Sequence, residues 1–283
     1  MPLPISSASN KNTLNRIGQT SNALAGNLAK LASGKRINTA ADDAAGMAIS
    51  AQLQSQIAST DQASSNISQG GALLRTAEGG LGQIGDMLSR GRELAVQAAN
   101  GTLNDQQRQA INKEFTNIKQ EIDRVTQTTE YNGQKLLDGG LGPNAQNPPV
   151  IQAGINATPN DRIAINQVNA SDTASLGIQN LSLDTASNAQ NALQGIDNAI
   201  SSVAQNRAGI GAMENRLQAG ASNLAVSKEN LTAADTQISG LDYAAEISSL
   251  KQNQVAMQAG LSALKSGLKT QEKMIGGLLN TKG

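Results

Sequence analysis

Apolar residues recur at alternating intervals of three and four positions over most of the chain. These series occupy residues 14–31, 67–88, 111–125, 196–238 and 250–278. Within two of the series a strict seven-residue repeat links successive large aliphatic side chains, as from Ile67 to Leu88 and from Ile210 to Ile238. Heptad spacing sustained over this length predicts long helices that pair in coiled-coil-like seams.

The middle of the chain lacks this pattern. Residues 129–184 hold four of the six prolines and many Gly and Asn residues. The segment DRIAINQVNA (161–170) alternates apolar and polar residues, as a half-buried strand does. VIQAGINA (150–157) precedes it, with Pro159 and Asn160 between them, so the two segments predict a β-hairpin.

The order of these elements predicts a mainly α fold. Long antiparallel helices fold back on each other as a coiled-coil-like bundle, the N- and C-termini are paired, and a small β-hairpin region lies in the middle. Two domains are expected. Residues 1–41 and 242–283 form an inner terminal-helix domain, and residues 42–241 form a helical core domain that includes the 129–184 excursion.

A pair of adjacent carboxylates, Asp42 and Asp43, raises the question of chemistry. They are candidates for an acid/base pair, for half of a metal site, or for a helix start. Gly34 is expected to end the preceding helix, and Thr39 is expected to be the N-cap of the next one, with Asp42 three residues on. The pattern favours the helix start, with the nearby Arg36 close enough to pair with the carboxylates across the connection.

Composition narrows the possible functions further. The chain has no His, no Cys and no Trp, and Phe115, Tyr131 and Tyr243 are its only aromatic residues. Zinc-finger sites, thiol catalysis and His-based triads are therefore excluded, whereas a hard-cation site made of carboxylates is not. No enzymatic activity, no cofactor and no metal are expected.

The charge is neutral overall but uneven along the chain. Residues 1–41 carry five basic residues and no acid, and residues 251–283 carry five lysines and one glutamate. No aromatic residues interleave the basic ones, so solvated helix faces are favoured over a nucleic-acid surface. No run approaches the ~18 apolar residues of a membrane span. The N-terminal stretch does not resemble a secretory signal peptide, so we expect a chain that is cytoplasmic or is exported without a cleaved signal.

Four segments resemble the bacterial flagellin family. LASGKRINTAADDAAGMAIS (31–50) resembles the N-terminal signature of the family, and RGRELAVQAANGTLNDQQRQAINKEF (90–115) resembles the next part of its pattern. YNGQKLLDG (131–139) resembles the end of that block, and NRLQAGASNLAVSKENLTAADTQISGLDYAAEI (215–247) resembles the C-terminal half. The resemblance covers both ends and most of the chain in the family's order.

The resemblance implies a subunit that self-assembles into the extracellular flagellar filament used for swimming. Only residues 129–184 fill the place where other flagellins insert outer domains, so a short, core-only type is implied. The implied partners are further copies of the chain in a helical homopolymer, an export chaperone, and cap and junction proteins, with no nucleic acid and no membrane. Export follows a flagellum-specific type III route, and the location is the filament outside the cell.

The resemblance also assigns roles to residues. The connection between the two domains is expected at Arg36, Asp42 and Asp43. The polymerisation seams are expected at Leu14, Leu24, Leu28, Leu31, Leu250, Met257, Leu261, Leu264 and Leu268.

A Toll-like receptor of vertebrate innate immunity recognises members of this family. Arg90, Glu93, Leu94, Gln97 and Glu114 match the family's contact positions. The alternative is that these residues serve subunit packing alone. For the whole chain, the alternatives are a hook–filament junction protein, which has a similar plan, and the cytoplasmic hairpin of a chemoreceptor, which would follow a transmembrane segment and end in a tight turn.

Overall fold

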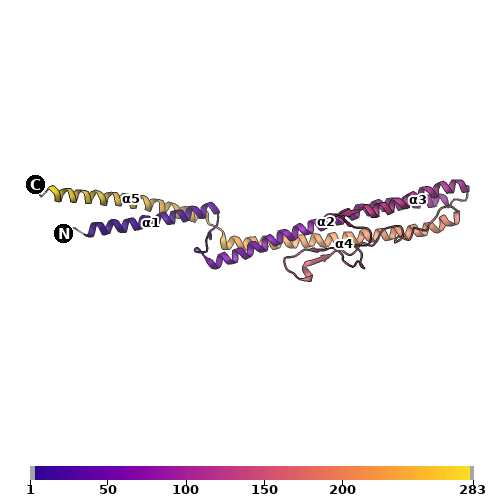
Figure 1. Ribbon diagram of the computed structural model, residues 1–283, viewed down its shortest axis with the longest axis horizontal. Coiled ribbons are helices and arrows are strands. Elements are labelled where there is room, and N and C mark those ends of the chain that lie inside the picture. Colours follow the sequence, from indigo (N-terminus) through magenta and orange to yellow (C-terminus); the bar gives the residue numbers. More distant parts are fainter. Residues whose placement is uncertain (1–3, 281–283) are drawn as a thin grey trace. The chain divides into compact units, whose positions relative to one another are not determined.

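The computed structural model describes residues 4–280, and it describes side chains from residue 8 to residue 273. The described chain is mainly helical, as predicted (Figure 1). Its helices are α1 (Pro4–Ser33), α2 (Ala44–Ala98), α3 (Asp105–Thr128), α4 (Ala186–Ser239) and α5 (Tyr243–Asn280), and the short 3-10 helix η1 spans Pro159–Asp161. None of the described helices is long and apolar enough to span a membrane.

The chain forms two compact units. Unit 1 contains residues 1–55 and 230–283, and unit 2 contains residues 56–229. The units thus divide inside the continuous helices α2 and α4, whereas the sequence places its domain boundaries beside the breaks in the helices, at 41/42 and 241/242. The two divisions describe different things, because the units follow contacts between neighbouring helices and the predicted boundaries follow the ends of helices. The predicted boundaries therefore stay a prediction.

Unit 1 is built on the pairing of α1 with α5. The two helices contact each other along their lengths, and the start of α1 and the end of α5 lie at the same end of the pair, as predicted (Figure 1). Helix α1 ends at Ser33, and Gly34 follows with a φ of 69°. This left-handed conformation is the usual helix-ending one for glycine, and it confirms the predicted break.

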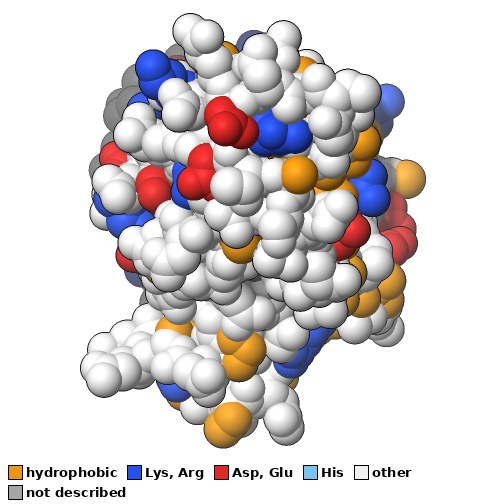
Figure 2. Space-filling model, turned by 90° about the vertical axis from the view of Figure 1, so that its right-hand side faces the viewer, with side chains coloured by type: hydrophobic (Ala, Val, Ile, Leu, Met, Phe, Trp, Pro, Cys, Tyr) orange, Lys and Arg blue, Asp and Glu red, His pale blue; other side chains and the backbone are white. Residues whose placement is uncertain are grey.

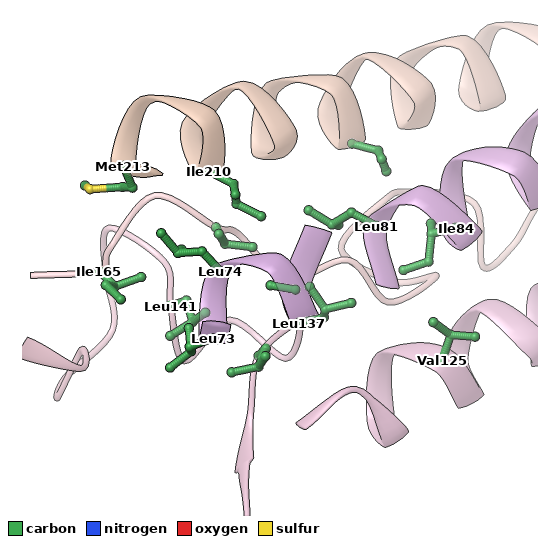
Figure 3. Packing of buried hydrophobic residues seen from close by; sticks show 14 of the residues in the cluster. Leu73, Leu74, Leu81, Ile84, Val125, Leu137, Leu141, Ile165, Ile210 and Met213 are labelled. Atoms are coloured by element: carbon green, nitrogen blue, oxygen red, sulfur yellow. The ribbon is translucent and has the colours of Figure 1, made fainter. Parts of the chain in front are cut away.

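Unit 2 has an aliphatic core between α2, α3, α4 and the central excursion. The seven-residue repeat on α2 is buried, with Leu74 and Leu81 fully shielded from solvent. Figure 3 shows how side chains from these elements converge. The residues labelled there are Leu73, Leu74, Leu81 and Ile84 of α2, Val125 of α3, Ile210 and Met213 of α4, and Leu137, Leu141 and Ile165 of the excursion.

A second, smaller core lies where α2 ends and where α3 and α4 begin. Its centre is Phe115, the one phenylalanine of the chain, which is 1% exposed. Helix α3 begins with a capping box, because Asn104 accepts from the Gln107 amide and the Gln107 side chain accepts from the Asn104 amide. Asn104 is therefore the N-cap of α3.

The excursion contains two small antiparallel hairpins. Strands β1 (Glu130–Tyr131) and β2 (Gln134–Lys135) are joined by Asn132 and Gly133, which both have positive φ. Strands β3 (Val150–Gln152) and β4 (Arg162–Ala164) pair with Ile151 opposite Ile163, which confirms the predicted hairpin. The second strand is shorter than expected, because the chain beyond Ala164 turns into the core and buries Ile165.

Figure 2 shows one face of the molecule. Uncharged polar side chains and backbone cover most of it, and apolar side chains gather there only in small groups. Acidic and basic side chains on this face are interspersed, and neither sign forms a continuous patch.

Candidate functional site

The seam between α1 and α5 follows a strict heptad in both helices. On the described parts of these helices the partly shielded residues follow alternating steps of three and four, apart from Lys30 near the end of α1. On α1 they include Asn10, Thr13, Ile17, Thr20, Leu24, Asn27 and Leu31, and on α5 they are Glu246, Leu250, Asn253, Met257, Gly260, Leu264, Gly267 and Gln271.

Specific contacts fix the antiparallel register of this pair. Asn10 Nδ2 donates to Gln271 Oε1 over 3.2 Å. Further along, Ile17 lies against Gly260, where an added Cβ would come within 3.1 Å of its side chain. In this register Ile17 thus lies against a glycine, and Asn10 lies opposite another polar side chain. No described side chain of α1 or α5 is fully buried.

The predicted polymerisation residues fall into two groups. Leu24, Leu31, Leu250, Met257 and Leu264 lie in the seam between α1 and α5. Leu14, Leu28, Leu261 and Leu268 lie outside it and are 50–54% exposed. The sequence pattern assigned them to one seam because it counted only apolar residues, whereas Thr, Asn and Gly occupy half of the seam positions.

The connection between α1 and α2 is anchored on the end of α4. The backbone amide of Arg36 donates to the Ser239 carbonyl over 2.7 Å, and its guanidinium Nη2 donates to the Ile238 carbonyl over 2.7 Å. Arg36 therefore binds the carbonyls at the end of a helix, where cations are stabilised. It was expected to pair with the carboxylates, but the cation beside Asp42 is Lys30.

Asp43 is the N-cap of α2, which corrects the prediction that Thr39 has this role. The helix begins at Ala44, and Asp43 Oδ1 accepts from the Gly46 amide over 2.9 Å. Thr39 instead begins a tight turn, because its carbonyl accepts from the Asp42 amide. Residues 40–42 form a turn between Thr39 and the cap Asp43, so the predicted cap at Thr39 lies four residues too early.

Asp42 stabilises the turn that precedes α2. Its Oδ2 accepts from the backbone amides of Asn38 and Thr39 and from the Thr39 hydroxyl, at 2.9–3.1 Å. These hydrogen bonds lower the pKa of the Asp42 carboxyl, and the bond from the Thr39 amide contributes most. Lys30, at 3.8 Å, makes a smaller contribution. Both carboxylates thus organise backbone, and no group of three metal-ligating residues occurs within residues 4–280.

A charged cluster joins α2 to α3 on the surface of unit 2. Arg90 donates to Glu114 Oε1 from Nε and from Nη2, over 3.1 and 2.8 Å, and its Nη1 donates to Glu93 Oε2 over 2.9 Å. These hydrogen bonds raise the pKa of the exposed Arg90 guanidinium, and the bonds to Glu114 contribute most. The cluster holds Arg90 in one position across two helices.

The other predicted members of this surface differ in their exposure to solvent. Gln97 is exposed one turn beyond Glu93, on the same face of α2. Leu94 is 1% exposed and packs in the second core, so the prediction that its side chain meets a partner is corrected. Gly91 explains how this core closes, because an added Cβ would lie 3.1 Å from the Phe115 ring.

Comparison with known proteins shows which family this fold belongs to. The model of the bacterial flagellin N-terminal helical region matches residues 6–140, and that of the C-terminal helical region matches residues 193–276. A flagellin of Bacillus subtilis (strain 168) is 38% identical over 279 residues, which cover 89% of this chain and 92% of that protein.

A second relative and a solved structure are also similar to this chain. The flagellar filament 30.7 kDa core protein of Treponema maltophilum is 34% identical over 255 residues, which cover 88% of this chain and 90% of that protein. A solved flagellin structure from Bacillus cereus is 31% identical with a TM-score of 0.48, over 60% of this chain and 94% of that one. The chain belongs to the bacterial flagellin family.

Proposed function

We propose that this chain is a structural subunit that self-assembles into the flagellar filament for swimming motility. The observation that carries the proposal is the incomplete burial of the α1/α5 pair. Its seam leaves every described side chain partly exposed, and four leucines beside the seam remain about half exposed. Apolar surface of this kind gains free energy when further copies cover it.

Folding of the pair is coupled to assembly in this proposal. A two-helix seam with Asn, Thr and Gly at half of its positions buries little apolar area, and isolated helices derive most of their stability from packing. The connection at Arg36, Asp42 and Asp43 joins the inner and core domains, and its hydrogen bonds set the direction in which the chain enters α2.

The excursion supports a core-only filament subunit. Leu137, Leu141 and Ile165 are buried among the helices of unit 2, so residues 129–185 cover the core and form no separate outer domain. The family consists of structural proteins, so the chain is not an enzyme. Its export through the flagellar type III route, with a chaperone and with cap and junction proteins as partners, belongs to the same proposal.

Electron microscopy after salting-out tests the filament function. The intact chain is compared with a variant that lacks residues 1–41 and 242–283, and circular dichroism confirms that this variant remains helical. Long tubular filaments from the intact chain alone are the expected result. Short caps or soluble monomer from both would overturn the proposal, and short caps would favour the hook–filament junction function.

A second function rests on the cluster around Arg90. Arg90, Glu93 and Glu114 form an exposed, hydrogen-bonded cluster with a rigidly held guanidinium, which suits a binding hot spot, and the exposed Gln97 lies beside it on α2. We propose that this surface is the ligand for the flagellin-sensing Toll-like receptor.

A reporter-cell assay with monomeric protein tests this second function. Arg90→Ala should lower the response, and Arg75→Ala is the matched control, because Arg75 is an exposed arginine on the same helix. Equal responses to the two variants, or no response to the unmodified chain, would reject the receptor function without affecting the filament proposal.

A further inference from the structure

The α1/α5 pair has two different sides. We call one row of residues beside the seam the leucine face. Each member directly follows a seam residue, namely Thr13, Asn27, Glu246, Gly260 or Gly267. Its members are Leu14, Leu28, Ile247, Leu261 and Leu268, each 44–54% exposed. In an antiparallel pair these positions of both helices flank the same edge of the seam, so the five side chains share one side.

The opposite edge of the seam is hollow. A groove of about 490 Å³ lies between the two helices there. Its α5 wall consists of Ala256, Ala259, Gly260 and Ala263, and its α1 wall includes Arg16 and Gln19. We call this the alanine groove. On its α5 wall small residues stand where the other edge of the same helix carries large ones.

The two sides repeat with the same period. Leu261 and Leu268 are seven residues apart on the leucine face, and Ala256 and Ala263 are seven residues apart in the groove. Seven residues of helix rise by about 10 Å, so the rows have equal spacing along the pair. A row with the spacing of the groove is therefore present on every other copy of the same chain.

Charge adds a second, weaker match. Glu272 lies one turn beyond Leu268 at the edge of the leucine face, and Arg16 lines the alanine groove. Both side chains are exposed, so they are free to pair across two copies. Lys251 and Lys265 also lie on the leucine edge, so apolar contact must supply most of the affinity and salt should favour it.

We infer that the leucine face of one copy seats in the alanine groove of the next copy. The inference rests on the proposed filament function and specifies which surfaces meet. Because the two surfaces are different and lie on opposite edges of one pair, the contact is heterologous and adds subunits without closing on itself as a face-to-face dimer would. A filament subunit requires this kind of contact.

Cysteine cross-linking tests the inference, since the native chain contains no cysteine. Single variants are made on the leucine face (Leu261→Cys and Leu268→Cys) and in the groove (Ala256→Cys and Ala263→Cys). A control variant, Val255→Cys, places the thiol at an exposed position outside both surfaces. One face variant is mixed with one groove variant, assembled, checked by electron microscopy and mildly oxidised.

At least one face–groove mixture should give about tenfold more disulfide-linked dimer than Val255→Cys mixed with either groove variant, because a disulfide forms only between Cα atoms within about 7 Å. Dimer from a face variant alone would show face-to-face contact and overturn the inference. Filaments without face–groove cross-links would also overturn it and leave the filament function standing. Should the unmodified chain form no filaments, the filament function fails, and a lack of mixed cross-links in soluble oligomers then overturns the inference.

Discussion

Asn10 donates a hydrogen bond to Gln271 across the seam of α1 and α5, at a position where a coiled coil normally places two apolar residues. A polar pair at such a position sets the register and lowers stability. The Asn27 amide lies opposite Asn253, 17 residues further along α1. In the amide orientation that satisfies its neighbours, the Asn27 oxygen lies 3.3 Å from Asn253 Nδ2 and repeats this polar arrangement.

Replacing the first pair should therefore strengthen the monomer and loosen its register. For Asn10→Leu combined with Gln271→Leu, we expect the free energy of unfolding of the α1/α5 pair to rise by about 1 kcal/mol. Thermal unfolding followed by circular dichroism measures the change. Asn15→Leu, at an exposed position on the same helix, is the control and should leave the transition almost unchanged. A lower melting temperature for the double variant would contradict the prediction.

The half-exposed leucines should matter for assembly more than for the monomer. Combining Leu261→Ala with Leu268→Ala removes apolar surface that the monomer leaves open, so the critical concentration for assembly should rise by roughly tenfold or more. Light scattering during assembly measures it. Ser262→Ala, exposed between the two sites, should have no such effect. Leu264→Ala should instead weaken the monomer, because this residue lies in the seam.

Apolar periodicity predicted the helices of this chain and the seam of α2 well, because Ile67 to Leu88 do bury one stripe. It failed where polar residues face inward. Asn206 is 2% exposed, and its amide exchanges hydrogen bonds with the backbone of Asn169. Arg108, 8% exposed, donates to the Ala98 and Asn100 carbonyls and so ends α2.

The same limit explains the errors at the candidate sites. Leu94 was taken for a contact residue from its family position, although its side chain is buried. The N-cap at Asp43 was missed because two adjacent carboxylates and a threonine all suit a cap, and only the turn at Thr39 decides among them. Sequence patterns report which residues suit a role, and the backbone path selects one.

Acid should weaken the turn before α2 through Asp42. The folded protein lowers the pKa of this carboxyl below 3.8, so its contribution is complete above about pH 4 to 5 and is lost as pH falls through the lowered pKa. The difference in thermal stability between the unmodified chain and Asp42→Asn should therefore be constant near neutral pH and shrink on acidification. It should persist in high salt, because hydrogen bonds cause most of the shift. A difference that grows on acidification would contradict this.

Two adjacent glycines of α2 offer a matched test of how the excursion packs on its helix. At Gly80 an added Cβ would lie 2.8 Å from Leu137 Cδ1 and 2.8 Å from Thr129 Oγ1, whereas at Gly79 it would meet nothing within 4 Å. Gly79→Ala should stabilise unit 2 by up to about 1 kcal/mol, because alanine is the better helix former. Gly80→Ala gains the same propensity but should lower stability by about 1–3 kcal/mol, because it forces the buried Leu137 to move. Denaturant unfolding of the two variants measures both changes. Equal stabilisation by both would show that residues 129–137 yield to α2 and do not pack rigidly against it.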